Sequence, residues 1–327
     1  MSDPTLALRD LVAPPHPPLF LGVDGGGSKT LAVVVDAAGR ERGRGMAGGA
    51  NYNALGLDAA LANLHAAVRA ALAAAQATPP AAIAWIGLAG VDRAADRALL
   101  LPHLAPLARA VHLSNDAELA LSALTAGVGV ALIAGTGSIA LGRDPAGVTA
   151  RAGGWGHILG DEGSGYDIGR RALQAALRAS DGRGPTSSLL PRILARWELP
   201  TADAVLNRVY PAGDKADIAA LAPLVLDAAA DGDAAARAII RRAAAELAVA
   251  ASAVARALTF HDGRVPLALG GALLVHAVPL REEVLRRLRR ALDLGPVAVV
   301  DQPAWSAARA AREMAAASLA RSVSPGS

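Results

Sequence analysis

The stretch Leu21-Gly-Val-Asp-Gly-Gly-Gly-Ser-Lys-Thr30 joins two apolar runs, and its pattern decides the fold class. Residues 19–24 predict a buried strand, and Leu31-Ala-Val-Val-Val-Asp36 predicts a second strand that begins almost at once. Three glycines between two strands make a tight turn whose N–H groups can approach a ligand closely. Asp24 places a carboxylate at the mouth of this turn. The arrangement suits a phosphate chain and its metal ion, although an ordinary glycine-rich hairpin has the same pattern.

The ending Ser28-Lys29-Thr30 mimics that of a Walker A motif, but two features exclude this motif. A Walker A motif needs Gly directly before its Lys, where this chain has Ser28, and a helix whose N-terminus points at the phosphates. Residues 30–35 are short, continuous and β-branched, which favours a strand. Because no helix opens after the glycines, a Rossmann dinucleotide site is excluded as well.

Composition limits the class of protein. At 327 residues the chain is long enough for two domains, and its apolar, Ala-rich composition suits a well-buried α/β protein. The net charge is only +3 and no Arg-rich block is interleaved with aromatic residues, so no nucleic-acid partner is expected. The chain has no Cys, which excludes disulfides, thiolate-bound zinc, Fe–S ligation and a Cys nucleophile.

No signal peptide is expected from the first residues of this sequence. Residues 1–18 contain Pro14-Pro15-His16-Pro17-Pro18, lack the apolar core of a signal peptide and predict a flexible segment. No run approaches 18 apolar residues free of charges and clustered glycines, so no membrane span is expected and the expected compartment is the cytoplasm. Residues 322–327 are expected to form a disordered tail.

A second candidate site follows a later strand. Residues 39–45 predict a polar turn, and the loop after them exposes the amide of Asn51. Residues 110–114 predict a strand that ends at Asn115-Asp116, and residues 117–124 predict a helix. Asp116 therefore sits at a strand-to-helix junction on the carboxyl edge of a sheet, where open α/β folds bind ligands. An Asp at such a junction can equally be the N-cap of the helix.

The opening pattern recurs further along the chain. Residues 128–134 predict a strand, Gly135-Thr-Gly-Ser138 a turn, and residues 139–143 a strand. This self-similarity predicts two related halves. Two glycine hairpins that face each other could hold a phosphate chain from both sides.

The glycine-rich run Gly153-Gly-Trp-Gly-His-Ile-Leu-Gly-Asp-Glu-Gly-Ser-Gly165 cannot be a packed element, and glycines on this scale usually mark a loop shaped around a ligand. A Trp bracketed by glycines favours a ligand wall over core packing. Helical patterns follow up to residue 259, then a strand over residues 265–269 that ends in Gly270-Gly271. A helix over residues 279–292, a strand over 296–300 and a helix over 304–319 complete the chain.

These separated motifs agree with one family. The chain resembles the sugar-kinase/actin/Hsp70 ATPase superfamily, and within it the BadF/BadG/BcrA/BcrD-type group that includes N-acetylglucosamine kinase. The motifs that carry the resemblance span almost all of the chain in the family's order, and they are Asp24-Gly-Gly-Gly-Ser-Lys-Thr30, Ser114-Asn-Asp-Ala117, Gly135-Thr-Gly-Ser138, Gly154-Trp-Gly-His-Ile-Leu-Gly-Asp-Glu-Gly-Ser164 and Leu269-Gly-Gly-Ala272.

The resemblance implies a role for each motif. Asp24 matches a carboxylate near Mg²⁺, and Asp116 matches the catalytic base. The residues that match ATP-binding positions are Gly26, Gly27 and Ser28 in the first phosphate motif, Gly135, Thr136 and Gly137 in the second, and Gly270 and Gly271 beside the adenosine. The residues that match sugar-lining positions, with Asp116, are Asn51, Gly154, Trp155 and Asp161.

The implied fold is α/β, with two ribonuclease H-like (actin-like ATPase) domains and an interdomain cleft. We expect a small domain over residues 19–125 and a larger domain with a helical insertion over residues 126–321. The implied reaction is ATP-dependent phosphorylation of an amino sugar at its 6-hydroxyl, with N-acetylglucosamine as the first candidate substrate. Glucosamine and N-acetylmuramic acid are alternatives, and the Ala-rich second half is compatible with a homodimer.

Other members of the superfamily fit the sequence less well. The ATPase activators of radical dehydratases bridge an Fe–S cluster with cysteines, which this chain lacks. The repressor/glucokinase group carries a Cys-rich zinc loop, which is also absent. An actin- or Hsp70-like nucleotide switch that acts through a protein partner would need insertions for which the chain has no room. ATP turnover measured with and without a sugar distinguishes such a switch from a kinase.

Overall fold

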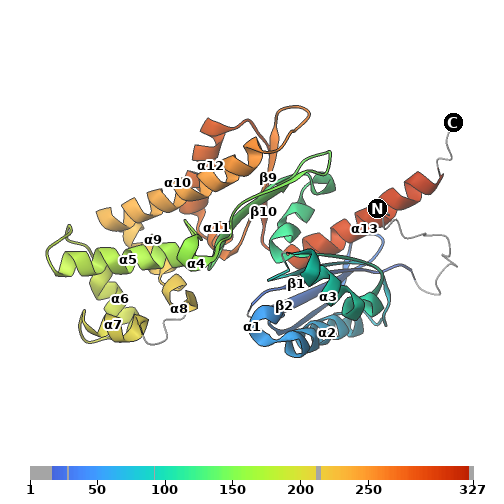
Figure 1. Ribbon diagram of the computed structural model, residues 1–327, viewed down its shortest axis with the longest axis horizontal. Coiled ribbons are helices and arrows are strands. Elements are labelled where there is room, and N and C mark those ends of the chain that lie inside the picture. Colours follow the sequence, from blue (N-terminus) through green and yellow to red (C-terminus); the bar gives the residue numbers. More distant parts are fainter. Residues whose placement is uncertain (1–16, 28, 92, 211–214, 324–327) are drawn as a thin grey trace. The chain divides into compact units, whose positions relative to one another are not determined.

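The computed structural model describes residues 17–27, 29–91, 93–210 and 215–323, and the chain forms two units. Unit 1 comprises Met1–Leu119 and Pro303–Ser327, and unit 2 comprises Ala120–Gln302. Each unit contains one five-stranded sheet with helices against it (Figure 1). No helix within the described ranges is long and apolar enough to cross a membrane.

The sheet of unit 1 has the strand order β3-β2-β1-β4-β5. Its strands are β1 (Phe20–Gly25), β2 (Lys29–Val35), β3 (Glu41–Gly48), β4 (Ala81–Leu88) and β5 (Ala108–Asn115). Strand β1 is antiparallel to β2 and parallel to β4, and β5 is parallel to β4. The predicted glycine hairpin between β1 and β2 is therefore confirmed.

The sheet of unit 2 repeats this topology, with the order β10-β9-β6-β7-β8. Its strands are β6 (Gly129–Ala134), β7 (Ser138–Arg143), β8 (Thr149–Gly153), β9 (Val265–Gly270) and β10 (Leu294–Val300). Strand β6 is antiparallel to β7 and parallel to β9, and β10 is parallel to β9. The α/β class and the prediction of two related halves are confirmed, including the second glycine hairpin.

Strand β3 corrects the prediction of a polar turn over residues 39–45. It pairs with β2, and helix α2 (Leu57–Ala74) packs on it. A Cβ atom on Gly43 or Gly45 would lie 2.1 Å from a backbone oxygen of α2. Glycines thus occupy the buried face of this strand because the helix lies against its backbone. No apolar alternation marks such a strand in the sequence.

The sheet of unit 1 is covered on both faces. Helices α2 and α3 (Ala94–Leu104) share one core with alternate residues of the central strands, and short helix α1 (Tyr52–Leu55) precedes α2. Helix α13 (Pro303–Val323) packs on the opposite residues of the same strands. The predicted helix over residues 117–124 is the 3₁₀ helix η2 (Asp116–Ala123). Two further 3₁₀ turns lie nearby: η1 (Ala105–Leu107) before β5, and η3 (Thr125–Gly127) after η2.

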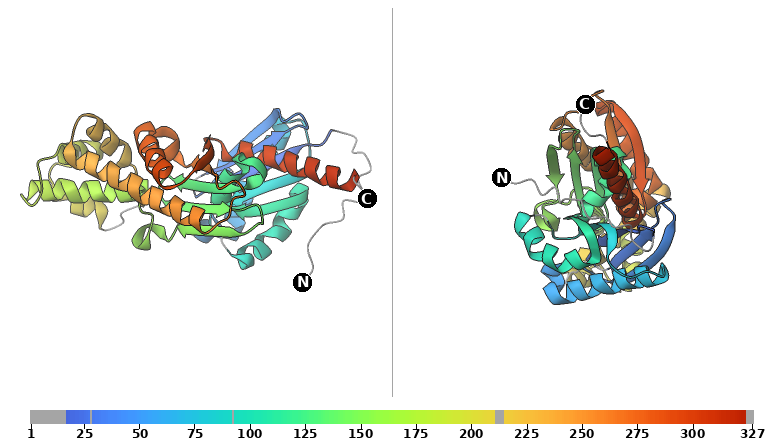
Figure 2. Two further views of the ribbon diagram at one scale, coloured as in Figure 1. Left: turned by 90° about the horizontal axis from the view of Figure 1, so that it is seen from above. Right: turned by 90° about the vertical axis from the view of Figure 1, so that its right-hand side faces the viewer.

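The position of α13 differs from the expected domain boundaries. Chain order placed residues 304–319 in the second domain, whose start was expected at residue 126. In the structure, Ala304 and Ala308 of α13 are buried against β1 of unit 1, and the chain divides after Leu119 (Figure 2). The helix returns because Gly22 of β1 offers no side chain, so that α13 lies directly on the strand.

The helices of unit 2 form one core with the face of its sheet. They are α5 (Gly165–Ser180), α6 (Leu189–Trp197), α7 (Ala204–Val209), α8 (Lys215–Ala219), α9 (Ala222–Ala230), α10 (Ala234–Arg256), α11 (Ala272–His276) and α12 (Val278–Ala291), whereas the short helix α4 (Gly156–Leu159) has no buried residue. Helix α10 packs against α5, α9 and α12, with its Ala-rich buried face at the centre of the core (Figure 1).

Asp233 anchors the start of α10. Its carboxylate accepts hydrogen bonds from the N–H groups of Ala236 and Ser188 and from the hydroxyls of Ser187 and Ser188. Desolvation opposes its charge, but these hydrogen bonds outweigh desolvation and lower the pKa of Asp233 to about 2.

Replacing Asp233 with Ala is expected to lower the free energy of unfolding by about 1–2 kcal/mol at pH 7. Because the folded-state pKa lies below the usual value of 3.8, this contribution is complete above pH 4 and is lost as the pH falls toward 2. Urea unfolding at pH 7, 4 and 2.5 measures it. Asp231→Ala is the control, because Asp231 is exposed and forms only a surface pair with Arg192. An equal loss at all three pH values would contradict the assignment.

Candidate functional site

The carboxyl edge of the unit 1 sheet brings two predicted site residues together. Strands β1, β4 and β5 are parallel, and Gly25 is in register with Leu88, which is in register with Asn115. Asp24 lies at the end of β1, and Asp116 follows β5 directly. The charge of Asp116 acts on the Asp24 carboxyl. Both acids therefore lie at the same edge, as the sequence predicted for Asp116.

Asp24 is half-buried at the mouth of the first glycine turn. Desolvation, and then repulsion from Asp116, raise the pKa of Asp24 to about 6, whereas Lys29 acts in the opposite direction. A carboxylate held in this way gains from a nearby cation. Among the described residues no group of three or more His, Cys, Asp or Glu could hold a metal. A Mg²⁺ ion that keeps waters and binds phosphate oxygens needs only one or two carboxylates, so Asp24 fits this ion.

The first glycine turn is open to ligands. The N–H of Gly26 donates to Lys29 O at 3.0 Å, which closes the turn, and a Cβ atom on Gly27 would meet nothing within 4 Å. The glycine at position 27 is thus not required by packing. Ser28, predicted to contact phosphate, lies outside the described residues.

Asn51 lies beside this turn. The preceding residue, Ala50, donates its N–H to Gly26 O at 2.9 Å. Asn51 caps α1 and accepts a hydrogen bond from the N–H of Asn53, whose side chain donates to Gly90 O. The loops after β1, β3 and β4 therefore meet at one edge of the sheet. The structure gives Asn51 a turn-capping role, which leaves its amide nitrogen for a ligand role to be tested.

The orientation of Asp116 is set by its neighbours. Ala117 donates its N–H to Oδ1 of Asp116 at 2.9 Å and to Oδ1 of Asn115 at 2.8 Å. The indole N–H of Trp85 donates to the Ser114 hydroxyl, which donates to Asn115 O, so the end of β5 is fixed from within the core. Asp116 is half-buried. The Ala117 N–H thus orients the carboxylate of Asp116, which is the first residue of η2.

In unit 2 the second glycine turn is held by helix α5. The N–H of Gly135 donates to Gly137 O, and the first two residues of α5, Gly165 and Tyr166, donate to Gly135 O and Thr136 O. The glycine-rich loop before α5 therefore ends directly at the predicted second phosphate motif. A shift in one of these segments must move the other.

Gly270 and Gly271 lie beside the same turn. Strands β6 and β9 are parallel neighbours, and a Cβ atom on Gly135 would lie 3.8 Å from Ala272 N. Gly271 has φ +82° and its Cβ position lies 2.4 Å from Ala134 O, so packing alone already requires glycine there. The structure thus brings the second phosphate motif and the predicted adenosine loop together.

The side chain of Asp161 is 5% exposed and contacts residues around the second glycine turn. Its Oδ1 accepts from the N–H of Ser138 at 3.2 Å, and its Oδ2 accepts from Lys215 Nζ at 2.7 Å. The Ser138 hydroxyl donates to Glu162 O. These contacts link the loop to the second turn, and the predicted contact of Asp161 with the sugar stays a prediction. No pattern in the sequence points to Lys215, which is 54 residues away.

Gly154 and Trp155 begin the same loop. Gly154 has φ +70° and its N–H donates to Ser138 O, which positions the loop against β7. The Trp155 side chain is 70% exposed, so it is not part of the core, and the Arg151 guanidinium lies 5.3 Å from its ring centroid. That Trp155 forms a wall of the sugar site stays a prediction.

Two sheets of one topology, each with a glycine turn between its first two strands, form a two-domain α/β fold of the sugar-kinase type. The model of the BadF/BadG/BcrA/BcrD ATPase family matches residues 21–291, and the chain belongs to this family.

Three relatives of known sequence or structure support this family assignment. The chain is 34% identical over 259 residues to the N-acetylmuramic acid/N-acetylglucosamine kinase of Clostridium acetobutylicum, covering 78% of this chain and 85% of that protein. It is 35% identical over 230 residues to the N-acetyl-D-glucosamine kinase of Dictyostelium discoideum, covering 66% and 72%. A solved structure of a candidate N-acetylglucosamine kinase from Chromobacterium violaceum has a TM-score of 0.70 and 30% identity, covering 90% of this chain and 98% of that one.

Proposed function

We propose that the protein phosphorylates an amino sugar with ATP, transferring the γ-phosphate to the 6-hydroxyl, and that Asp116 is the general base. The observation that carries this proposal is the register that places Asp24 and Asp116 at one carboxyl edge. Phosphoryl transfer needs neutralised phosphate charge, in-line positioning and a carboxylate that takes the hydroxyl proton. Asp24 would meet the first need through a bound Mg²⁺, and Asp116 would meet the last.

The two units would contribute different ligand contacts. In unit 1, Asp24 would hold Mg²⁺, which neutralises phosphate charge when bound, and Gly26, Gly27 and Ser28 would lie beside the phosphates. In unit 2, the turn at residues 135–137 would bind phosphate and Gly270-Gly271 would lie beside the adenosine. The residues that would line the sugar are Asn51, Asp116, Gly154, Trp155 and Asp161.

N-acetylglucosamine is the first candidate substrate because both curated relatives are named for it. N-acetylmuramic acid is the second, because the Clostridium acetobutylicum relative is named for both sugars. Coupled ADP release with N-acetylglucosamine, N-acetylmuramic acid and glucosamine at equal concentration tests the proposal. Sugar-stimulated turnover with negligible turnover in its absence is expected. Equal ATP turnover with and without every sugar would instead favour a nucleotide switch.

Lys215→Met is expected to raise the KM for the sugar about tenfold with a smaller change in kcat. Removing the ammonium leaves Asp161 buried without its ion pair, so the loop that carries Trp155 loses its fixed position. Lys215→Arg, which keeps the charge, should restore most of the affinity. Steady-state kinetics with varied sugar at saturating ATP measures this. An unchanged KM in the Met variant would show that Asp161 does not position the loop through Lys215.

A further inference from the structure

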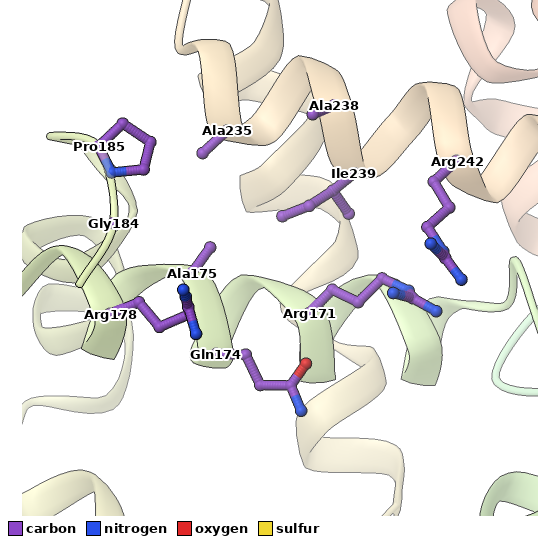
Figure 3. Close-up of a pocket in the computed structure, with 10 residues that line it drawn as sticks. All are labelled: Arg171, Gln174, Ala175, Arg178, Gly184, Pro185, Ala235, Ala238, Ile239 and Arg242. Atoms are coloured by element: carbon purple, nitrogen blue, oxygen red, sulfur yellow. The ribbon is translucent and has the colours of Figure 1, made fainter.

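A groove lies within unit 2, and the glycine turn at residues 135–137 does not line it. Its cavity has a volume of about 290 Å³ and lies between α5 and the start of α10, with Gly184 and Pro185 at one end (Figure 3). Its apolar lining comes from Ala175 of α5 and from Ala235, Ala238 and Ile239 of α10. Because three of these four side chains are alanine methyl groups, the two helices leave a furrow between them.

The rim of the groove is cationic. Arg171 and Arg178 of α5 lie seven residues apart, on one face of the helix, and Arg242 of α10 lies opposite. In Figure 3 the guanidinium groups of Arg171 and Arg242 lie at one end of the groove and that of Arg178 at the other. No Asp or Glu is among the residues that line the groove. The acids beside the arginines are Asp167, bound by Arg171, and Glu246, 3.5 Å from Arg242.

We propose that this groove binds a small organic anion, with a carboxylate or phosphate head and a short apolar body, and that the bound anion regulates the glycine-rich loop before α5. Arg171 and Arg242 would hold the head, and the alanines and Ile239 would cover the body. A sugar is a poorer fit, because Gln174 supplies the one neutral polar side chain in the lining. The volume lies near the lower end of the ~300–1,000 Å³ range of ligand pockets, which limits the occupant to a small molecule.

The groove is connected to the loop by two sets of contacts. Arg171 Nε donates to Oδ2 of Asp167 at 2.9 Å, and the same oxygen accepts from the N–H of Gly163 at 3.2 Å. Gly163 also lies against α10, where its Cβ position is 2.6 Å from Ala243 O, one residue beyond Arg242. Gly163 follows Asp161 by two residues. Both helices that form the groove thus contact the loop that carries Asp161.

The expected direction of regulation follows from Asp167. Burial opposes its charge, but hydrogen bonds from Arg171, Gly163 and Arg170 outweigh burial and keep the pKa of Asp167 below its usual value. An anion that draws Arg171 toward the groove removes part of this support, and the hold on Gly163 weakens. The affinity for the sugar should then fall. This step rests on the proposed kinase function, whereas anion binding itself does not.

Calorimetry with hexanoate, 1-hexanol and inorganic phosphate tests the binding step. Hexanoate should bind, and hexanol and phosphate should each bind more weakly, because each lacks one half of the required chemistry. Arg242→Gln should weaken hexanoate binding roughly threefold to tenfold. Ala238→Trp, which fills the furrow, should abolish it. Arg241→Gln is the matched control, because Arg241 is the adjacent residue and does not line the groove. Thermal unfolding checks that each variant is folded.

The outcomes separate the two parts of the proposal. No hexanoate binding, or equal loss in Arg241→Gln and Arg242→Gln, overturns the site, whether or not the protein phosphorylates a sugar. Phosphate binding as tight as hexanoate overturns the apolar part of the ligand class. If hexanoate binds, saturating hexanoate should raise the KM for the sugar severalfold in the unaltered protein and not in Ala238→Trp. An unchanged KM overturns the regulation and keeps the site.

Discussion

Asp116→Asn is expected to lower kcat for sugar phosphorylation by about 10²–10⁴-fold, because an amide cannot accept the hydroxyl proton. Asn can still accept the hydrogen bond from Ala117, so the start of η2 should stay in place. Nucleotide binding should not weaken. Repulsion from Asp116 raises the pKa of Asp24, so removing that charge leaves Asp24 more readily ionised and available to Mg²⁺. Coupled ADP release and calorimetric titration with Mg-ATP measure the two effects.

The matched control is Glu118→Gln. Glu118 lies two residues further along η2 and pairs with Arg97 at 3.3 Å. Its replacement removes a carboxylate of the same segment without touching Asp116. We expect less than a threefold change in kcat, of the size produced by loss of a partly exposed ion pair. Full activity in Asp116→Asn, or an equal loss in both variants, would rule out Asp116 as the base.

The parts of the fold that the sequence predicted are those with a complete local pattern. Both glycine hairpins were found because each joins two apolar strands, and their similarity predicted the repeated topology. Strand β3 was missed because Gly43 and Gly45 fill its buried face and leave no apolar alternation. The return of α13 to unit 1 was missed because chain order carries no information on a contact between segments far apart in sequence.

In the candidate site, too, the sequence predicted the residues that follow a local pattern and not the contacts between distant segments. Asp24 and Asp116 were predicted because each ends a recognisable strand at a carboxyl edge. The contacts of Asp161 were not, because Lys215 comes from a separate helix with no motif of its own. The sequence could not distinguish a glycine required by packing from a glycine that leaves space for a ligand. Gly271 is required by packing against Ala134, whereas Gly27 meets nothing and is free to serve a ligand.

Gly22→Ala is expected to lower the free energy of unfolding by roughly 3 kcal/mol or more, the upper range for overpacking a core. The added Cβ would lie 1.9 Å from Ala304 O and 2.4 Å from Ala308 N. Both are backbone atoms of α13, so no side-chain rotation relieves the contact and the helix must move off β1. Because β1 also carries Asp24, the same change should weaken Mg-ATP binding.

Gly27→Ala is the matched control for this prediction. It adds the same methyl group five residues away, where nothing lies within 4 Å, and it should change stability by no more than about 0.5 kcal/mol. Urea unfolding followed by Trp fluorescence compares the two variants, since Trp85 lies in the core that α13 covers and Trp305 of α13 packs against that core. Equal stability would mean that α13 does not rest on β1. A loss confined to Gly22→Ala would show that a helix from the far end of the chain supports the strand that presents Asp24.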